Sequence, residues 1–168
     1  MWCSIREVGI FVAGLALLLS ACGYHFSSAA PIALPRDMQQ LYLGEIEDPT
    51  TEPQLESRLR TGIRNEFTQR GEVKWVSRER AEGLLRIRIF SFSSSSKLEN
   101  PEQETVRYEA VMRFRGRIFQ SEDDALVWES KELTVRESYS QQSESDRAKR
   151  RLVRLAAEKL ANQLGQKF

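Results

Sequence analysis

The stretch VRYEAVMRFRGRIF, from Val106 to Phe119, decides the fold. Apolar and charged side chains alternate along it, which is typical of a β-strand with one buried face and one exposed face. The face predicted to be buried carries Val106, Tyr108, Ala110, Met112, Phe114 and Ile118. The opposite face carries Arg107, Glu109, Arg113, Arg115 and Arg117. We therefore expect a sheet that is packed on one side and open to solvent on the other.

Residues on either side of this stretch supply the other strands. They are predicted over Leu41–Ile46, Leu84–Phe92 and Leu126–Ser138, with Val73–Ser77 as a short strand or a connection. In the last of these the alternation changes parity between Trp128 and Leu133, which a bulge near residues 129–132 would reconcile. The serine-rich segment from Ser93 to Glu104, about twelve residues, is predicted to be a loop that projects from one end of the sheet.

Two amphipathic helices complete the pattern. In the first, Leu55, Leu59, Ile63 and Phe67 recur every four residues, after a capping-box spacing of Thr51 and Gln54 and before a stop at Gly71. The second opens with a capping-box pattern at Ser143–Asp146. Its apolar stripe is Val153, Ala156, Ala157, Leu160 and Leu164.

The predicted element order is therefore β-α-β-β-β-α. Strands that alternate cleanly favour a mostly antiparallel sheet, and two helices can cover only its apolar face. We expect an α+β fold, a two-layer sandwich with both helices packed on one face of the sheet.

The N-terminus reads as an export signal. Residues 8–21 form an apolar run preceded by Arg6, too short to span a membrane, which needs roughly 20 apolar residues. A buried helix is the alternative. The end of the run, Leu19-Ser20-Ala21-Cys22, resembles the bacterial lipobox. That resemblance implies a diacylglycerol on the thiol of Cys22, cleavage before it and acylation of the new amine.

This interpretation divides the chain and places it in the cell. Residues 1–21 are expected to be a lipoprotein signal peptide, residues 22–36 a lipidated tether, and residues 37–168 a single periplasmic α+β domain. Cys3 would leave with the signal, so Cys22 keeps no disulfide partner. Gly23 stands where an aspartate would resemble an inner-membrane retention signal, which favours the outer membrane.

Composition argues against several classes of function. The chain has 168 residues and a formal net charge of +1, so no overall positive field attracts nucleic acid. His25 is the only histidine, and no serine lies in a nucleophile-elbow pattern. Carboxylate pairs such as Asp123-Asp124 lie in an expected turn. We therefore predict no catalytic residue, no metal site and no cofactor.

The mature start, Cys22-Gly23-Tyr24-His25-Phe26, together with the element order, resembles the LptE family of lipopolysaccharide-assembly lipoproteins. The resemblance implies a protein that is not an enzyme. It would plug the lumen of a large LptD-type β-barrel, help that barrel to assemble, and bind lipopolysaccharide on its way to the outer leaflet. The alternative is an independent outer-membrane lipoprotein that acts as a periplasmic chaperone or a cell-wall adaptor.

Five arginines are the candidate lipopolysaccharide-binding residues: Arg86, Arg88, Arg113, Arg115 and Arg117. If their two strands form a hairpin, all five project from the open face, and guanidinium groups suit phosphate and carboxylate. The alternative is a solvated strand face balanced by Glu109, Glu129 and Glu132. A helical set, Arg147, Arg150, Arg151 and Arg154, is interpreted as mostly a soluble face.

Overall fold

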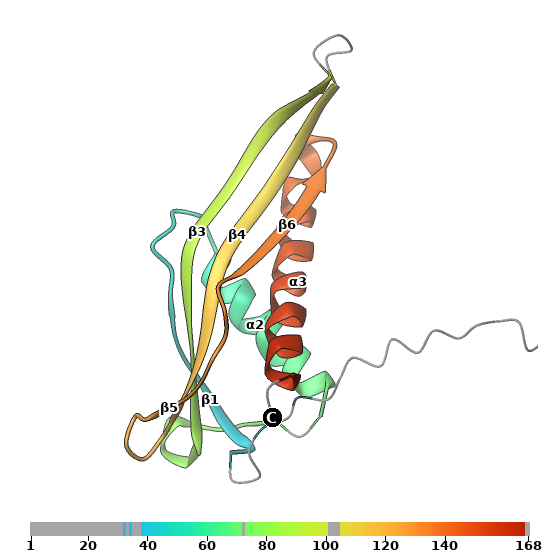
Figure 1. Ribbon diagram of the computed structural model, residues 1–168. Coiled ribbons are helices and arrows are strands. Elements are labelled where there is room, and N and C mark those ends of the chain that lie inside the picture. Colours follow the sequence, from blue (N-terminus) through green and yellow to red (C-terminus); the bar gives the residue numbers. More distant parts are fainter. Residues whose placement is uncertain (1–31, 33, 35–37, 72, 101–104, 167–168) are drawn as a thin grey trace, which may run out of the picture.

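Two helices lie against a six-stranded sheet in the computed structural model (Figure 1). It describes residues 32, 34, 38–71, 73–100 and 105–166, so the predicted signal peptide and Cys22 lie outside the described residues. The strands are β1 Gln40–Glu47, β2 Lys74–Trp75, β3 Gly83–Asn100, β4 Thr105–Gln120, β5 Leu126–Glu129 and β6 Leu133–Tyr139. The helices are α2 Leu55–Gln69 and α3 Ser145–Gly165, with short 3₁₀ turns η1 Arg78–Arg80 and η2 Gln142–Glu144.

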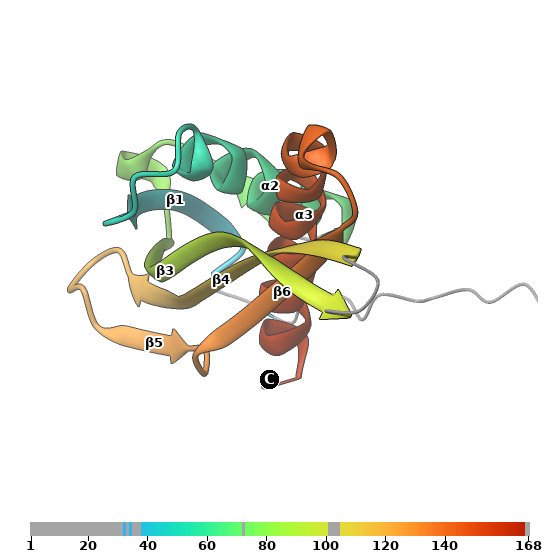
Figure 2. The ribbon, with the colours of Figure 1, turned by 90° about the horizontal axis from the view of Figure 1, so that it is seen from above.

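The sheet is mixed, with β3 and β4 at its centre. Its strands follow the order β2-β1-β3-β4-β5, and β6 also pairs with β4. β1 runs parallel to β2 and β3, whereas β4 is antiparallel to β3, β5 and β6. Both helices lie on the same side of this sheet (Figures 1 and 2). The predicted two-layer α+β sandwich, mostly antiparallel, is confirmed.

The core forms where the inward strand residues meet the helix stripes. Ala110, Met112, Phe114 and Ile118 of β4 are all fully buried, as the alternation predicted. The α2 stripe of Leu55, Leu59, Ile63 and Phe67 is buried, and so is the predicted α3 stripe. Period-2 and period-3.6 patterns therefore identified the faces that pack together.

Neither predicted capping box forms. Gln54 is the N-cap of α2, has a positive φ of 63°, and makes no side-chain capping hydrogen bond. Thr50, not Thr51, turns back locally, donating from its N–H to Oδ1 of Asp48 at 3.0 Å. At α3 the turn η2 comes first and Glu144 is the N-cap without a side-chain cap. The predicted stop of α2 at Gly71 holds, because Gly71 adopts φ 83°, a conformation that favours glycine.

The predicted loop over Ser93–Glu104 is wrong for residues 93–100, and residues 101–104 lie outside the described part of the chain. β3 continues to Asn100 and β4 begins at Thr105, and register pairs join the two strands along this whole length, for example Ser93 with Val111. The serines at 93–96 are all exposed, so no apolar alternation marks the strand. Backbone pairing with β4, rather than side-chain burial, extends the hairpin.

The predicted bulge lies where β5 ends and β6 begins. Trp128 pairs with Ile118, and Leu133 pairs with Phe114. The chain therefore advances five residues from Trp128 to Leu133 while β4 advances only four. The extra residue restores the parity, and both Trp128 and Leu133 are buried on the helix side. The bulge interrupts the strand predicted over Leu126–Ser138, so the structure has two strands there, β5 and β6.

Gly116 in β4 hydrogen-bonds to the segment between β5 and β6 and allows α3 to approach the sheet closely. The backbone N–H of buried Ser130 donates to Gly116 O at 2.9 Å, and its Oγ accepts from the Gly116 N–H at 3.0 Å. A Cβ atom at Gly116 would lie 2.6 Å from Cδ1 of Leu160 in α3. The missing side chain thus lets the helix pack directly on the central strand.

Part of the predicted tether contacts the domain. Ile32 is 1% exposed and belongs to the core, and Leu34 packs against that core. The boundary predicted at residue 36 remains a prediction, although Ile32 and Leu34 on its N-terminal side pack on the domain.

Candidate functional site

The five predicted arginines come together on the open face of the sheet. β3 and β4 form the predicted hairpin, with Arg86 opposite Arg117 and Arg88 opposite Arg115. Arg113 lies opposite Ser91, one step beyond the bulge in β3. Their neighbours Leu85, Ile87 and Ile89 are buried on the helix side. We call Arg86, Arg88, Arg113, Arg115 and Arg117 the arginine face.

Every arginine of this face has a carboxylate partner. The N···O distances are 2.9 Å for Arg86–Asp124, 3.3 Å for Arg88–Glu47, 2.7 Å for Arg113–Glu132, 3.2 Å for Arg115–Glu129 and 2.7 Å for Arg117–Glu129. Like charges directly opposite in a strand pair repel, and these carboxylates relieve that repulsion. Glu129 serves two arginines, so five guanidinium groups share four carboxylates in these pairs.

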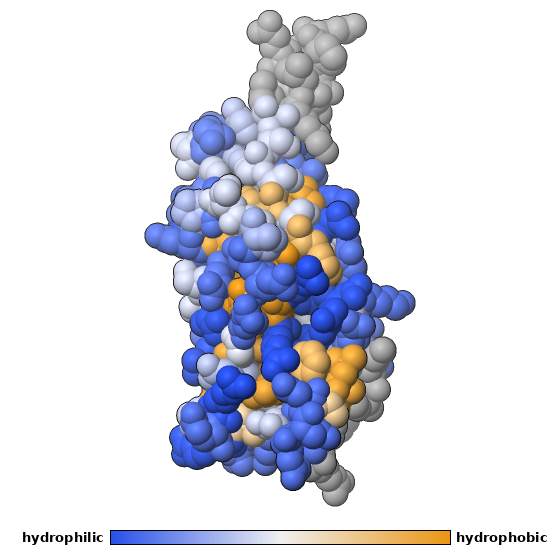
Figure 3. Space-filling view, turned by 90° about the vertical axis from the view of Figure 1, so that its left-hand side faces the viewer, coloured by the Kyte–Doolittle hydropathy of each residue, from blue (hydrophilic) through white to orange (hydrophobic). Residues whose placement is uncertain are grey.

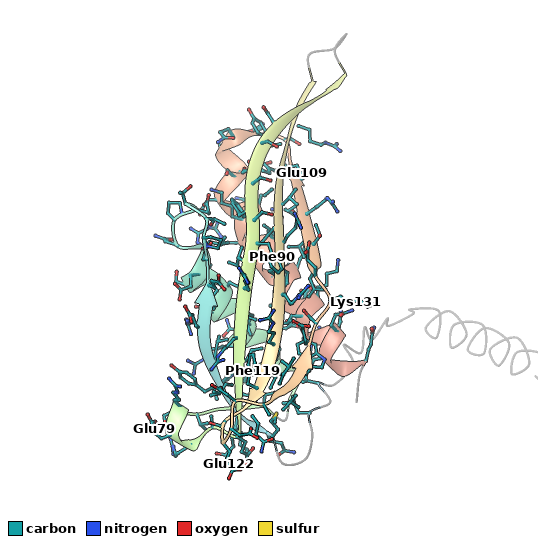
Figure 4. The ribbon with its side chains drawn as sticks, turned by 60° about the vertical axis from the view of Figure 1, so that its left-hand side comes forward. Glu79, Phe90, Glu109, Phe119, Glu122 and Lys131 are labelled. Atoms are coloured by element: carbon teal, nitrogen blue, oxygen red, sulfur yellow. The ribbon has the colours of Figure 1, made fainter. Side chains whose placement is uncertain are left out.

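Two aromatic rings lie among the guanidinium groups. The guanidinium of Arg86 lies 4.6 Å from the ring centre of Phe119, and those of Arg88 and Arg115 lie 5.7 and 5.6 Å from that of Phe90. Figure 4 shows Phe90 and Phe119 along the open side of the hairpin, with Glu109 further along. The space-filling view of this side shows hydrophobic patches among hydrophilic side chains (Figure 3). Rings and charges therefore form one mixed surface.

Phe90 is not among the residues predicted for this surface, although its parity in the strand matches that of Arg86 and Arg88. Alternation from Arg86 and Arg88 places Phe90 on the open side, whereas Phe92 pairs with the buried Met112 because the register shifts. The register shift between Ile89 and Ser91 inserts Phe90 as an extra residue on the open side. Because of this bulge Ser91, and not Phe90, pairs with Arg113, and the ring of Phe90 lies beside Arg88 and Arg115.

The chemistry of this arrangement suits an anion. Guanidinium groups present several N–H donors to phosphate or carboxylate oxygens, and the present carboxylates already fill some of them. An incoming phosphate has to compete with these ion pairs, which are exposed to solvent and therefore weak. Within the described residues there is no group of three or more potential metal ligands, and no helix there is long and apolar enough to cross a membrane.

Acid is expected to weaken this network. The hydrogen bond from Arg117 holds the pKa of Glu129 below its ordinary value of 4.5, and that from Arg113 does the same for the pKa of Glu132. When folding lowers the pKa of a carboxyl group, its ionised form stabilises the folded protein at pH values above the pKa that the group has in the unfolded chain. That contribution is lost as the pH falls through the lowered folded pKa.

We therefore expect the melting temperature of the wild type to fall more steeply than that of Glu129→Gln once the pH drops below about 4.5. The variant lacks the titrating carboxyl and keeps the shape of the side chain. Thermal melts followed by circular dichroism between about pH 6 and pH 3 measure the difference. Parallel curves for the two proteins would show that the Arg117–Glu129 pair adds no stability.

Solved structures share the fold at low sequence identity. A protein from Xanthomonas campestris superposes with a TM-score of 0.57 at 14% identity, covering 83% of this chain and 89% of its own. An uncharacterized lipoprotein B from Nitrosomonas europaea gives 0.54 at 15% identity, covering 79% and 84%. A putative lipoprotein from Caulobacter crescentus gives 0.50 at 18% identity, covering 72% and 88%. At these identities the likeness shows the fold alone.

Sequence comparison identifies the family. No curated protein sequence matched this chain. A family model, LptE, described as lipopolysaccharide-assembly, matches residues 38–167. This range contains all the helices and strands of the structure, together with the arginine face. The chain therefore belongs to the LptE family of lipopolysaccharide-assembly proteins.

Proposed function

We propose that this protein is an outer-membrane lipoprotein that plugs an LptD-type β-barrel, helps that barrel to assemble, and binds lipopolysaccharide on its way to the outer leaflet. The observation that carries the lipopolysaccharide part is the arginine face. It gathers five guanidinium groups on the side of the sheet that the helices leave open.

The chemistry of the arginine face suits a phosphorylated glycolipid. Lipid A phosphates can accept two hydrogen bonds from one guanidinium, which is stronger than a single point-charge contact. Phe90 and Phe119 offer flat apolar surface beside the charges. Sugar rings or acyl chains can rest there while the phosphates bind the arginines.

The barrel part rests on family membership and predicts a stable complex. Detergent extraction of outer membranes that contain the tagged full chain should recover a β-barrel protein in stoichiometric amount. A tagged, unrelated outer-membrane lipoprotein treated in the same way serves as the control. Recovery of the chain without a barrel, or with cell-wall components instead, would favour an independent chaperone or adaptor.

The anchor predicts the form of the mature N-terminus. Mass spectrometry of the mature chain should find a peptide that starts at Cys22 and carries fatty acids, with residues 1–21 absent. Cys22→Ala should release the chain from the membrane fraction and leave the melting temperature unchanged, because Cys22 precedes the buried Ile32 by ten residues. Detection of Met1, or of a free thiol at Cys22, would rule out the anchor.

A further inference from the structure

Helix α3 has a large excess of positive charge. In α3, basic residues are Arg147, Lys149, Arg150, Arg151, Arg154 and Lys159, and the only acidic ones are Asp146 and Glu158. This one helix therefore has a formal charge of +4 in a chain whose net charge is +1. The concentration of charge is on the side of the sheet away from the arginine face, so the proposed binding of lipopolysaccharide does not explain it.

A groove runs between the outer sides of α2 and α3. The two helices lie side by side and run in the same direction, since Arg58 contacts Asp146 near their N-terminal ends at 2.8 Å. Near their C-terminal ends, Arg70 donates to Oδ1 of Asn162 at 2.6 Å. The groove has a volume of about 520 Å³. Its lining on α2 extends from Ser57 to Gln69, which corresponds to about 18 Å of helix.

The floor of the groove is apolar because a glycine faces a valine. A Cβ atom on Gly62 would lie 2.9 Å from Cγ1 of Val153, so the helices touch closely there. A side chain inserted from outside can therefore rest on apolar surface between the two ridges.

The two ridges differ in chemistry. On α2, Asn65 and Gln69 lie one turn apart and are exposed, and their side chains make no hydrogen bond to another described residue. On the α3 side lie Arg150 and Arg154, whose side chains are 59% and 67% exposed. Arg150 shares the carboxylate of Asp146 with Arg58, Arg154 pairs with Glu158 at 3.6 Å, and Glu66 of the lining pairs with Arg70 at 2.6 Å. Three carboxylates therefore serve four guanidinium groups at the groove.

We propose that an acidic segment of a protein partner lies in this groove. The excess of guanidinium over carboxylate calls for a negatively charged occupant. Asn65 and Gln69 each offer both a donor and an acceptor, which matches the N–H and C=O groups of a polypeptide, whereas a phosphate offers acceptors only. The length of the groove suits about five residues of extended chain. An acidic peptide thus uses the charged ridge, the amide ridge and the apolar floor together.

A photocrosslinker tests this in the full-length chain. p-Benzoylphenylalanine at Asn65, activated in intact cells, should cross-link to a protein, and mass spectrometry should map the link to a segment rich in aspartate and glutamate. In the Arg150→Glu, Arg154→Glu background the cross-link should fall at least tenfold. The neutral pair Arg150→Gln, Arg154→Gln should show a smaller loss of cross-link yield. It replaces the reversed pair as the test variant if the reversed pair does not fold.

The matched control is Lys74→Glu with Arg80→Glu, which changes the net charge by the same amount at exposed sites outside the groove. This control should keep the cross-link. A link to lipid or lipopolysaccharide, to a segment without acidic residues, or to nothing would overturn the proposal. Equal yields in the groove variants and the control would do the same. None of these results depends on whether the arginine face binds lipopolysaccharide.

Discussion

Replacing Phe114 by alanine is expected to lower the free energy of unfolding by about 4 kcal/mol. Phe114 lies in the middle of β4, is fully buried, and pairs with Ile89 on one side and Leu133 on the other. Removal of the ring leaves a cavity between the sheet and the helices that the packed core cannot fill. For a domain of this size, the melting temperature should fall by roughly 10 °C.

Phe119→Ala is the matched control for this prediction. Phe119 stands on the same strand but on the open face, half-buried beneath the guanidinium of Arg86. Its loss removes an exposed cation–π contact, worth about 0.5–1 kcal/mol, and some surface packing. Denaturant unfolding of both variants measures the difference. Similar losses for the two would contradict the assignment of the buried and open faces.

The fold could be predicted wherever burial imposes a period on the sequence. Phe114 and its inward neighbours alternate because one side of β4 faces the helices, and Leu55 to Phe67 repeat because one side of α2 faces the sheet. The bulge before Leu133 could also be predicted from the sequence, because an extra residue breaks the alternation of apolar and polar side chains. These signals are local, and a single sequence contains them in full.

The missed features depend on contacts that local patterns do not record. The serines after Phe92 are held by backbone pairing with β4, and a ladder of that kind leaves no trace in side-chain polarity. The parallel placement of β1 against β3 likewise depends on distant residues. The capping boxes failed because the turns before both helices take other conformations, with Gln54 in the left-handed region.

The members of the arginine face were predictable, but only two of its four carboxylate partners, Glu129 and Glu132, were. Strand parity was enough to place Arg86 and Arg115 on one side. Glu129 was expected to balance the face, and it does so by binding two arginines at once. Glu47 and Asp124 come from β1 and from the turn after β4, so only the tertiary structure identifies them as partners.

Arg86→Glu with Arg115→Glu is expected to weaken lipopolysaccharide binding about a hundredfold at low salt. Each lost charge-assisted hydrogen bond is worth about 1.5 kcal/mol, and two of them correspond to roughly a factor of 100. Both side chains are partly exposed and point away from the core, so the fold should persist. Screening weakens exposed charge interactions, so the gap between wild type and variant should shrink as salt rises.

Two further proteins make this comparison specific. Arg86→Gln with Arg115→Gln removes the positive charges without adding repulsion from Asp124 and Glu129, and it should lose less affinity than the reversed pair. Lys74→Glu with Arg80→Glu carries the same change in net charge outside the arginine face and should bind like the wild type. Circular dichroism and thermal melting establish that all of the proteins are folded.

The most direct test is the affinity of the full-length protein for purified lipopolysaccharide, measured by titration at low and at physiological salt for these four proteins. We predict tight binding by the wild type and the Lys74, Arg80 control. The reversed Arg86, Arg115 pair should bind about a hundredfold more weakly at low salt, with a smaller gap at physiological salt. Equal affinity of the folded reversed pair and the wild type would contradict the account and leave the arginine face as a solvated surface.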